Sequence, residues 1–536
     1  MEKRSAAAHV VDILVTSDIH GHIYPTDYRT REVRDMGLAK AATIIRRERL
    51  VSPQLLLVDN GDLIQGSPQA YYYARKQGDR PHPAVVVLNE LQYDAAVLGN
   101  HEFNYGLDAL RTIVRDSRFP WLSAGITDDK SNEPAFGMPY ITKVVGDGIK
   151  VAILGITTHF IPNWENPLHI EDLSFADALE TTRTWVARIR EEENPQLLVV
   201  SYHGGFERNL ATGLPEGRGT SENQAYAMCT EVEGIDVLIT GHQHRSLAAE
   251  VNGVTIIQPG CNGGAVGKVS VEFADVEGQW TIAAKKAELL RVDHTIAPDE
   301  AVLELTRDME SETQAWLDQQ IGQVVGDMTI TSPLECRRAD HPFIAFINKV
   351  QMEIAGVELS HTALLNHESE GFGSIITMRD ILTNFMYPNT LTVLRLTGSD
   401  IREALEQTAA YFRVEAGGAL GVNPSYIEPK LLHYNYDMWA GIEYELDVSR
   451  PIGERVVKLM GSKGQPIEPD GHYDVVMNSY RASGGGDYDM YRGKPVVKEI
   501  DIDMSELIAD NIIQRKIIYA ERSSRWKVVI DTAEHE

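Results

Sequence analysis

The stretch DAAVLGNHEFNYG, residues 94 to 106, starts as a short apolar run and then changes abruptly to amide, imidazole and carboxylate side chains. The first 270 residues contain further runs of this form: VVDILVTSD (10–18), QLLLVDNGD (54–62), VAILGITTH (151–159), LLVVSYHGG (197–205) and DVLITGHQH (236–244). Helical patterns such as GLAKAATIIRRERL (37–50) lie between these runs. The alternation predicts an α/β fold whose buried strands carry polar residues on the loops at their ends.

Length and charge narrow the class of protein. A chain of 536 residues exceeds the size of a single core, so we expect at least two domains, and the 43% hydrophobic and 24% charged residues are typical of a globular protein. The net charge of −28, from 50 basic and 78 acidic residues, disfavours a nucleic acid duplex as partner. A small anionic substrate remains compatible with this charge if a divalent cation dominates its site.

The sequence carries few signals for location or assembly. No apolar leader segment precedes the first strand, and no run of about 18 apolar residues occurs, so the chain as written is expected to be cytoplasmic, without a membrane partner. It would be an exported protein if a signal peptide had been removed. The three cysteines, Cys229, Cys261 and Cys336, lack CxxC spacing and are expected to be buried or neutral thiols. No obligate protein partner is evident.

The pattern changes towards the C-terminal half. Strands at 264–273 and 280–292 close the first region, and residues 298–322 follow with helical periodicity. Mixed strands and helices come after, including LTVLRLTG followed by a helix for which Ser399 or Asp400 is the expected N-cap. We expect a first domain over 1–296, a linker helix over 297–320 and an α+β domain over 321–536.

Candidate metal ligands gather at five of the predicted strand ends. They are Asp18, His20, Asp62, Asn100, His203, His242 and His244. Each fragment alone is commonly a capped turn or a hydrogen-bonded histidine, but their joint occurrence in this order indicates a metal site. Carboxylate, imidazole and amide ligands suit Zn, Mn, Fe or Co, and Mg less well, and the mixture suggests two divalent ions that share one carboxylate.

The motifs SDIHGH, VDNGDLIQGSP, LGNHEFNYG, VVSYHGG and ITGHQH together resemble those of the calcineurin-like metallophosphoesterases. The resemblance implies a four-layer α/β/β/α sandwich with two metal ions. One ion would be held by Asp18, His20, Asp62 and His244, and the other by Asp62, Asn100, His203 and His242. Asp62 would bridge them.

The same resemblance assigns a catalytic role to His101, which would stabilise the transition state or protonate the leaving oxygen. Asn104 would orient its ring: where the 5'-nucleotidase pattern has an Asp, this amide can hydrogen-bond the imidazole without supplying charge. Asp27, Glu102 and Asp108 also lie near these motifs, and we interpret them as solvated turn or cap residues.

The second half resembles the C-terminal domain of the 5'-nucleotidase group, through MYPNTLTVLRLTG, HYNYDMWAGIEYELDVSRP and VVMNSYRASGGGDYDMY. The resemblance implies that Tyr387 and Tyr480 stack on the base of a nucleotide. Asn389 and Asp487 would make polar contacts to the base or sugar. The expected ligand is therefore a small nucleotide.

Two features resemble one branch of this group, the 2',3'-cyclic-nucleotide 2'-phosphodiesterases/3'-nucleotidases: GNHEFNYG in place of GNHEFD, and the segment NYDMWAGIEYELDVSRPIGERV. The leading hypothesis is a two-metal phosphoesterase that hydrolyses 2',3'-cyclic nucleotides and 3'-nucleotides by in-line attack of metal hydroxide on phosphorus. The alternatives are a 5'-nucleotidase or nucleotide-sugar hydrolase, a nucleotide- or metal-binding protein without turnover, and a DNA metallonuclease, which the charge of −28 disfavours.

Overall fold

The computed structural model describes residues 8–530 except 79, 164, 217–220, 388, 429, 501 and 523–524. The chain divides into two compact units, unit 1 (Met1–Thr313) and unit 2 (Gln314–Glu536). The helix α7 (Glu300–Leu317) contains this boundary, so it belongs partly to each unit.

Unit 1 contains two six-stranded sheets. The first has the order β14 (Gln279–Arg291), β13 (Ala265–Val276), β1 (Ala8–Thr16), β2 (Leu56–Asp59), β3 (Ala95–Val97) and β4 (Trp121–Leu122). The second has the order β11 (Ser246–Val251), β12 (Val254–Pro259), β10 (Val237–Thr240), β9 (Leu197–His203), β7 (Ile149–Thr157) and β6 (Tyr140–Val145). The strands β1 to β4 run parallel to one another, as do β7, β9, β10 and β12. The pairings β1–β13, β13–β14, β11–β12 and β6–β7 are antiparallel.

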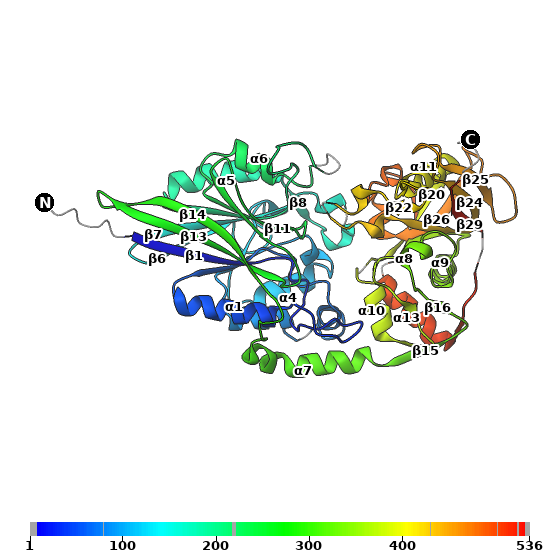
Figure 1. Cartoon of the computed structure of the whole chain (residues 1–536), viewed down its shortest axis with the longest axis horizontal. Coiled ribbons are helices and arrows are strands. Elements are labelled where there is room, and N and C mark those ends of the chain that lie inside the picture. The colour runs from blue at the N-terminus through cyan, green and yellow to red at the C-terminus, as the bar shows by residue number, and fades with distance from the viewer. Residues whose placement is uncertain are drawn as a thin grey trace. The chain divides into compact units, whose positions relative to one another are not determined.

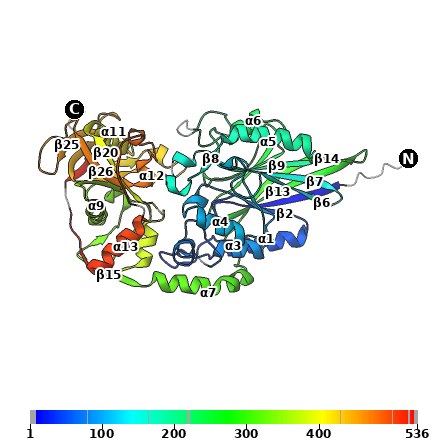
Figure 2. The ribbon, with the colours of Figure 1, turned by 180° about the vertical axis from the view of Figure 1, so that it is seen from behind.

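The two sheets pack face to face, with helices outside. Ile13 and Val58 of the first sheet share one apolar core with Val151 and Val199 of the second. The helices α1 (Leu38–Val51), α3 (Pro83–Glu90) and α4 (Leu107–Asp116) lie on one side of the sheets, and α5 (Ala178–Glu192) and α6 (Ala225–Glu231) on the other (Figure 2). Because the central strands are covered on both faces, they are continuous apolar runs. The expected four-layer α/β/β/α sandwich is confirmed.

Unit 1 also contains α2 (Pro68–Tyr71) and a small sheet of β5 (Ile126–Asp128) and β8 (Leu173–Phe175).

Unit 2 is a mixed α+β domain (Figure 1). Its five-stranded sheet has the order β23 (Asp437–Ala440), β17 (Leu359–Ala363), β26 (His472–Asn478), β20 (Leu391–Thr397) and β27 (Val496–Ile500). Two three-stranded sheets are β19 (Ile375–Thr377), β15 (Gln320–Val325), β28 (Ile517–Tyr519), and β25 (Val456–Gly461), β24 (Ile442–Asp447), β29 (Trp526–Val529). Two strand pairs are β16 (Met328–Thr329) with β18 (Gly371–Phe372), and β21 (Phe412–Val414) with β22 (Leu420–Val422).

The helices of unit 2 are α8 (Pro333–Cys336), α9 (Pro342–Ala355), α10 (Met378–Asn384), α11 (Gly398–Ala409), α12 (Ser479–Ala482) and α13 (Met504–Arg515). Phe343 and Ile347 of α9 pack into one core with Val393 and Val475 of the five-stranded sheet. The α+β class expected for this half is confirmed.

The N-cap expected for α11 was wrong. Thr397 caps the helix: its side chain accepts the N–H of Asp400, and the Asp400 carboxylate accepts the N–H of Thr397 at 2.9 Å. This is a capping box, in which Asp400 is the third helical residue. The helix begins earlier than expected because β20 ends at Thr397 and turns directly into it.

The state of the cysteines agrees with the thiols expected from the sequence. Cys229 and Cys336 are buried thiols, and burial raises the pKa of each to about 12, whereas Cys261 is a partly exposed thiol. Among the described residues, the helices are too short or too polar to cross a bilayer.

His82 makes the stability of unit 1 depend on pH. Its Nδ1 accepts the N–H of Ala84 at 3.3 Å and so caps α3, and burial lowers the pKa of the ring to about 4. In the unfolded chain a histidine has a pKa of about 6.5, so the unfolded state binds the extra proton between these two values. The contribution of His82 to the stability of unit 1 is therefore fully present above pH 6.5 and is lost as the pH falls towards 4.

The variant His82→Asn keeps a capping side chain but does not titrate. Between pH 7.5 and pH 5 we expect unit 1 of this variant to lose about 2 kcal/mol less stability than the original chain. Urea unfolding measured at several pH values checks this, with the exposed His294→Asn as a control that should follow the original curve. Parallel curves for His82→Asn and the original chain would contradict the prediction.

Candidate metal centre

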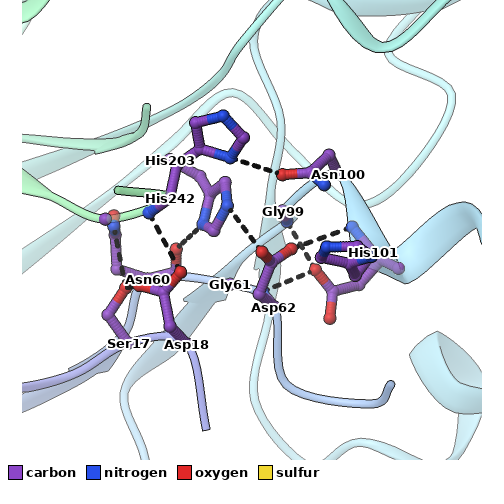
Figure 3. A network of polar contacts seen from close by, with 12 residues as sticks. Ser17, Asp18, Asn60, Gly61, Asp62, Gly99, Asn100, His101, His203 and His242 are labelled. Atoms are coloured by element: carbon purple, nitrogen blue, oxygen red, sulfur yellow. Dashed lines mark hydrogen bonds and ion pairs between the residues drawn. The ribbon is translucent and has the colours of Figure 1, made fainter. Parts of the chain in front are cut away.

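The polar residues at five strand ends of unit 1 meet in one place (Figure 3). Asp18 and His20 follow β1, Asp62 follows β2, and Asn100 follows β3. From the second sheet come His203, the last residue of β9, and the pair after β10, His242 and His244. The strands that carry them run parallel within each sheet, so their carboxyl ends lie at one edge.

Asp18, His20 and His244 form the first of two groups that could hold a metal ion, with their ligand atoms all within 4.8 Å of one another. The Nε2 atoms of His20 and His244 are 3.0 Å apart, and Nε2 of His244 lies 3.5 Å from Oδ1 of Asp18. Two ring nitrogens and a carboxylate oxygen thus converge as ligands of one cation would.

The second group consists of Asp62, His203 and His242, again with ligand atoms within 4.8 Å. Nε2 of His203 lies 3.1 Å from Oδ2 of Asp62. The amide of Asn100 belongs beside this group, because its Oδ1 lies 2.8 Å from Nδ1 of His242. The backbone N–H of His242 donates to Oδ1 of Asp18 at 2.9 Å and so ties the two groups together.

Several of these residues have a left-handed backbone, which is unfavourable for any residue except glycine. The φ angles are 53° at Asp18, 51° at His20, 54° at Asp62, 65° at His242 and 57° at His244. Such conformations cost of order 1 kcal/mol or more each and cluster at functional sites, where the surrounding structure enforces them. The centre is therefore a strained region of the fold, supported by the buried sheets beneath it.

Backbone carbonyls orient two of the rings. Nδ1 of His20 lies 2.9 Å from the carbonyl oxygen of Gln65, and Nδ1 of His203 lies 2.6 Å from that of Asn60. A ring that donates from Nδ1 keeps the Nε2 lone pair for a metal. Nε2 of His203 is buried beside the Asp62 carboxylate, and its geometry there does not satisfy a hydrogen bond to any of the described residues. The donor set and this unsatisfied nitrogen fit a divalent cation.

The ionisation of the side chains in the second group also favours a bound cation. Burial alone would raise the pKa of Asp62, but the His203 imidazole beside it holds that pKa well below its usual range. The pKa of His203 rises to about 10 in spite of burial, because of the Asp62 carboxylate. Burial lowers the pKa of His20 to about 3, so this ring is neutral. In the metal-free protein a proton on His203 thus neutralises Asp62, and a cation would replace it.

The interpretation of Glu102 as a solvated residue was wrong. Its side chain is fully buried and accepts the N–H groups of Asp62 at 2.8 Å, Leu63 at 2.7 Å and Gly99 at 2.6 Å. The carboxylate therefore clamps the loop after β2 to the loop after β3. Gly99 is needed at this place because a Cβ would overlap the carboxylate of Asp62.

The other two acidic residues behave as expected from the sequence. Asp27 accepts the backbone N–H of Arg29 at 2.8 Å within a turn, and Asp108 is exposed in the first turn of α4.

His101 lies next to both groups. Its backbone N–H donates to Oδ1 of Asp62 at 2.8 Å, and its ring centre is 5.4 Å from that of His20. Nδ1 of the His101 ring lies 2.6 Å from Oδ1 of Asn104. The contact expected between this imidazole and this amide is present.

Sequence reasoning missed Glu222. Its Oε1 lies 2.6 Å from Nε2 of His242, so the carboxylate orients the ring whose Nδ1 faces the second group. Metal-binding histidines commonly have such a carboxylate partner. No motif marks Glu222, which lies in a loop 20 residues before His242.

In unit 2, the two tyrosines predicted to stack on a base belong to one aromatic cluster. The ring centres of Tyr387 and Tyr480 lie 6.1 Å and 6.5 Å from that of Tyr434, a residue that sequence reasoning did not select. Arg481 holds this arrangement: its Nη2 donates to the Tyr434 carbonyl at 3.1 Å, and its guanidinium lies 5.5 Å from the Tyr480 ring centre. Arg481 itself is anchored by a buried ion pair with Asp437 at 2.7 Å.

Asn389 and Asp487 lie close in sequence to these tyrosines. The N–H of Asn389 donates to the Tyr387 carbonyl at 2.8 Å. Asp487 has a left-handed backbone with φ 64° and follows the glycine run 484–486. A Cβ at Gly485 would lie 2.6 Å from the Tyr480 ring, so glycine is required for this close approach.

The sandwich of unit 1 and its converging carboxylate, imidazole and amide groups define the chain as a metal-dependent phosphoesterase. Two family models match it: "Calcineurin-like phosphoesterase" over residues 11–246 and "5'-nucleotidase, C-terminal domain" over residues 320–493. The chain belongs to the 5'-nucleotidase family, in which a calcineurin-like phosphoesterase domain precedes this C-terminal domain.

Individual relatives cover nearly the whole chain. A Staphylococcus aureus protein assigned as a 5'-nucleotidase, solved in complex with alpha-ketoglutarate, is 36% identical with a TM-score of 0.87, over 97% of this chain and 100% of that one. The 2',3'-cyclic-nucleotide 2'-phosphodiesterase/3'-nucleotidase of Salmonella typhimurium is 28% identical over 90% of this chain and 82% of its own length. The trifunctional nucleotide phosphoesterase YfkN of Bacillus subtilis is 26% identical over 98% of this chain, which spans 39% of YfkN.

Proposed function

We propose that this phosphoesterase hydrolyses 2',3'-cyclic nucleotides to 3'-nucleotides and then removes the 3'-phosphate. The observation that carries the proposal is the amide at position 104, which contacts the His101 ring at 2.6 Å where the 5'-nucleotidase pattern has an acid. The similarity to the Salmonella enzyme, whose name includes both activities, supports it.

The proposal includes two divalent metal ions. Asp18, His20, Asp62 and His244 would hold one, and Asp62, Asn100, His203 and His242 the other. The donor set favours Mn, Zn, Fe or Co over Mg. Two such cations, when bound, supply an activated water and neutralise charge on the phosphoryl oxygens.

The side chains of the protein then transfer the proton and position the substrate. In the first step water adds to phosphorus, the bond from phosphorus to the 2'-oxygen breaks, and that oxygen takes up a proton. His101 lies beside the first group of metal-binding side chains and is the residue we assign to this proton transfer. In the second step another water adds to phosphorus, the bond from phosphorus to the 3'-oxygen breaks and that oxygen takes up a proton, so that the products are a nucleoside and phosphate.

For recognition of the nucleoside we propose the aromatic residues of unit 2. Tyr387 and Tyr480 would stack on the base, which contributes roughly 1 to 3 kcal/mol and tolerates several bases because each has a π-face. Asn389 and Asp487 would contact the base or sugar through their polar side chains. The Arg481–Asp437 ion pair supports this region by fixing Tyr434 and Tyr480.

The second candidate function is that of a 5'-nucleotidase or nucleotide-sugar hydrolase with the same metal centre. The 36% identity with the Staphylococcus aureus protein favours it. The two candidates differ in the leaving group on phosphorus, which is the 2'- or 3'-oxygen of the ribose in the first candidate. In the second it is the 5'-oxygen of a nucleotide or a phosphate oxygen of a nucleotide sugar.

A substrate panel decides between them. Purified full-length protein, loaded in turn with Mn, Zn, Co, Fe and Mg, is assayed on 2',3'-cyclic AMP, 3'-AMP, 5'-AMP and UDP-glucose. We expect kcat/KM to be at least about tenfold higher for the cyclic diester or 3'-AMP than for 5'-AMP, a difference of about 1.4 kcal/mol in transition-state binding. Preference for 5'-AMP or UDP-glucose would instead establish the second candidate.

A further inference from the structure

The amide of Asn104 is held from both sides. Its Oδ1 lies 2.6 Å from Nδ1 of His101, and its Nδ2 donates to Oε2 of Glu165 at 2.6 Å. An ionised carboxylate only accepts hydrogen bonds, so the NH2 group of the amide must face Glu165 and its oxygen must face His101. The network therefore fixes the orientation of the Asn104 amide.

Glu165 is itself anchored by its surroundings. Its side chain is 8% exposed, and its other oxygen, Oε1, accepts the N–H of Asn166 at 2.9 Å and lies 2.9 Å from Nδ1 of His169. These contacts come from the turn that leads into the short helix η4 (Pro167–His169), so they do not depend on Asn104.

We propose that Glu165 is a positioning residue for His101 and acts through the amide of Asn104. This inference rests on the role assigned to His101 in the proposed function. Because Oδ1 of Asn104 can only accept, Nδ1 of His101 carries a hydrogen, and Nε2 is the nitrogen left to exchange a proton with the substrate. In a simple His–Asp pair the carboxylate contacts the imidazole directly, whereas here it lies one residue further out.

This arrangement explains why position 104 carries an amide. An Asp side chain there would direct a carboxylate oxygen at Oε2 of Glu165, where the two atoms now lie 2.6 Å apart as donor and acceptor. Two carboxylates at such a distance repel each other, and one of them would have to take up a proton or turn away. The Glu165 side chain, 61 residues along the chain, thus selects Asn over Asp at position 104.

Four variants of the full-length, metal-loaded protein test the proposal. Glu165→Ala should lower kcat for 2',3'-cyclic AMP by about tenfold or more with KM nearly unchanged, since a misplaced catalytic group reduces turnover more than binding. Glu165→Gln should lose less kcat than Glu165→Ala, because its oxygen can still accept from Asn104, although its NH2 group then faces the N–H of Asn166. Asn104→Asp should lose at least as much as Glu165→Ala. The double variant Asn104→Asp/Glu165→Gln should recover at least about tenfold over Asn104→Asp, because the new amide donates to Asp at 104.

The exposed Asp108→Asn is the matched control, since it removes a nearby carboxylate outside the network and should leave kcat unchanged. The proposal is overturned if Glu165→Ala keeps full kcat, or if the double variant is no more active than Asn104→Asp.

A measurement without turnover separates this inference from the proposed function. Nitrogen-15 NMR of histidine-labelled, full-length protein, with His101 assigned through His101→Gln, reports which ring nitrogen carries the hydrogen. We expect His101 to be the Nδ1–H tautomer in the original chain and a mixture of tautomers in Glu165→Ala. The same tautomer distribution of His101 in both proteins would refute the role of Glu165. If none of the nucleotides is hydrolysed, the proposed function fails while this result still decides the inference.

Discussion

The variant Asp62→Asn is expected to abolish phosphoester hydrolysis, lowering kcat by about 10³-fold or more, and to remove at least one equivalent of bound metal per chain. The magnitude corresponds to the several kcal/mol of charge stabilisation that a bound cation supplies. Elemental analysis of the purified variant and its rate on 2',3'-cyclic AMP check both parts.

The physical reason lies in the contacts of the Asp62 carboxylate. Oδ2 lies 3.1 Å from Nε2 of His203, and Oδ1 accepts the backbone N–H of His101 at 2.8 Å, so the side chain touches both a proposed ligand and the proposed acid. Asn has the same shape and can still accept from His101, so the fold should persist. What it lacks is the negative charge that holds a cation in a buried site.

The matched control is Asp59→Asn, in the same segment. Asp59 is equally buried, and burial raises its pKa to about 8, so at neutral pH it is mostly protonated and its replacement by Asn changes little charge. It accepts a hydrogen bond from Thr16 at 2.7 Å, within the sheet. We expect metal content and kcat close to those of the original chain. Full metal content and turnover in Asp62→Asn would exclude this carboxylate as the shared ligand.

The second large effect is expected from His101→Ala, which should lower kcat for 2',3'-cyclic AMP by about 10²- to 10⁴-fold, the range typical of lost general acid catalysis. Metal content should stay unchanged, because the ring of His101 is outside both groups of proposed ligands. Parallel measurements of kcat, KM and bound metal test this.

A change of leaving group tests the mechanism of the loss. On bis(p-nitrophenyl) phosphate the leaving group is stable without a proton, so His101→Ala should cost much less on this substrate than on the cyclic nucleotide. His159→Gln is the control: this histidine also follows a parallel strand, β7, but its Nε2 lies 3.2 Å from Ser221 and its Nδ1 accepts the N–H of Ala178. Equal losses on both substrates would indicate that His101 stabilises charge and does not donate a proton.

The fold and the location of the centre were accessible from the sequence because they depend on local patterns. Apolar runs that stop at Asp, Asn or His mark buried parallel strands, and such strands end at a common edge. The seven candidate ligands could therefore be named together, and the structure brings their side chains together. Their role as ligands is still a proposal.

Residues that support the centre could not be chosen in this way. Glu102 looked like a solvated acid, and only the packed loops reveal that it is buried against four backbone N–H groups. Glu222 belongs to no recognisable motif, and Tyr434 lies in the HYNYDMW segment without a signal that distinguishes it from the other aromatic residues there. The partners of both residues are distant in sequence. The left-handed backbone at Asp18 and His242 is equally invisible, because the surrounding structure imposes it.

The sequence by itself thus determined the two-domain class and which chemical groups the strand ends carry, because the periodicity of burial is written along the chain. Tertiary structure alone decided how those groups are oriented and which charges lie beside them, because most of their hydrogen-bond partners come from other loops. Position 104 illustrates this difference. The sequence shows an amide three residues after His101, and only the fold places Oε2 of Glu165 2.6 Å from Nδ2 of Asn104, where an amide fits and a carboxylate does not.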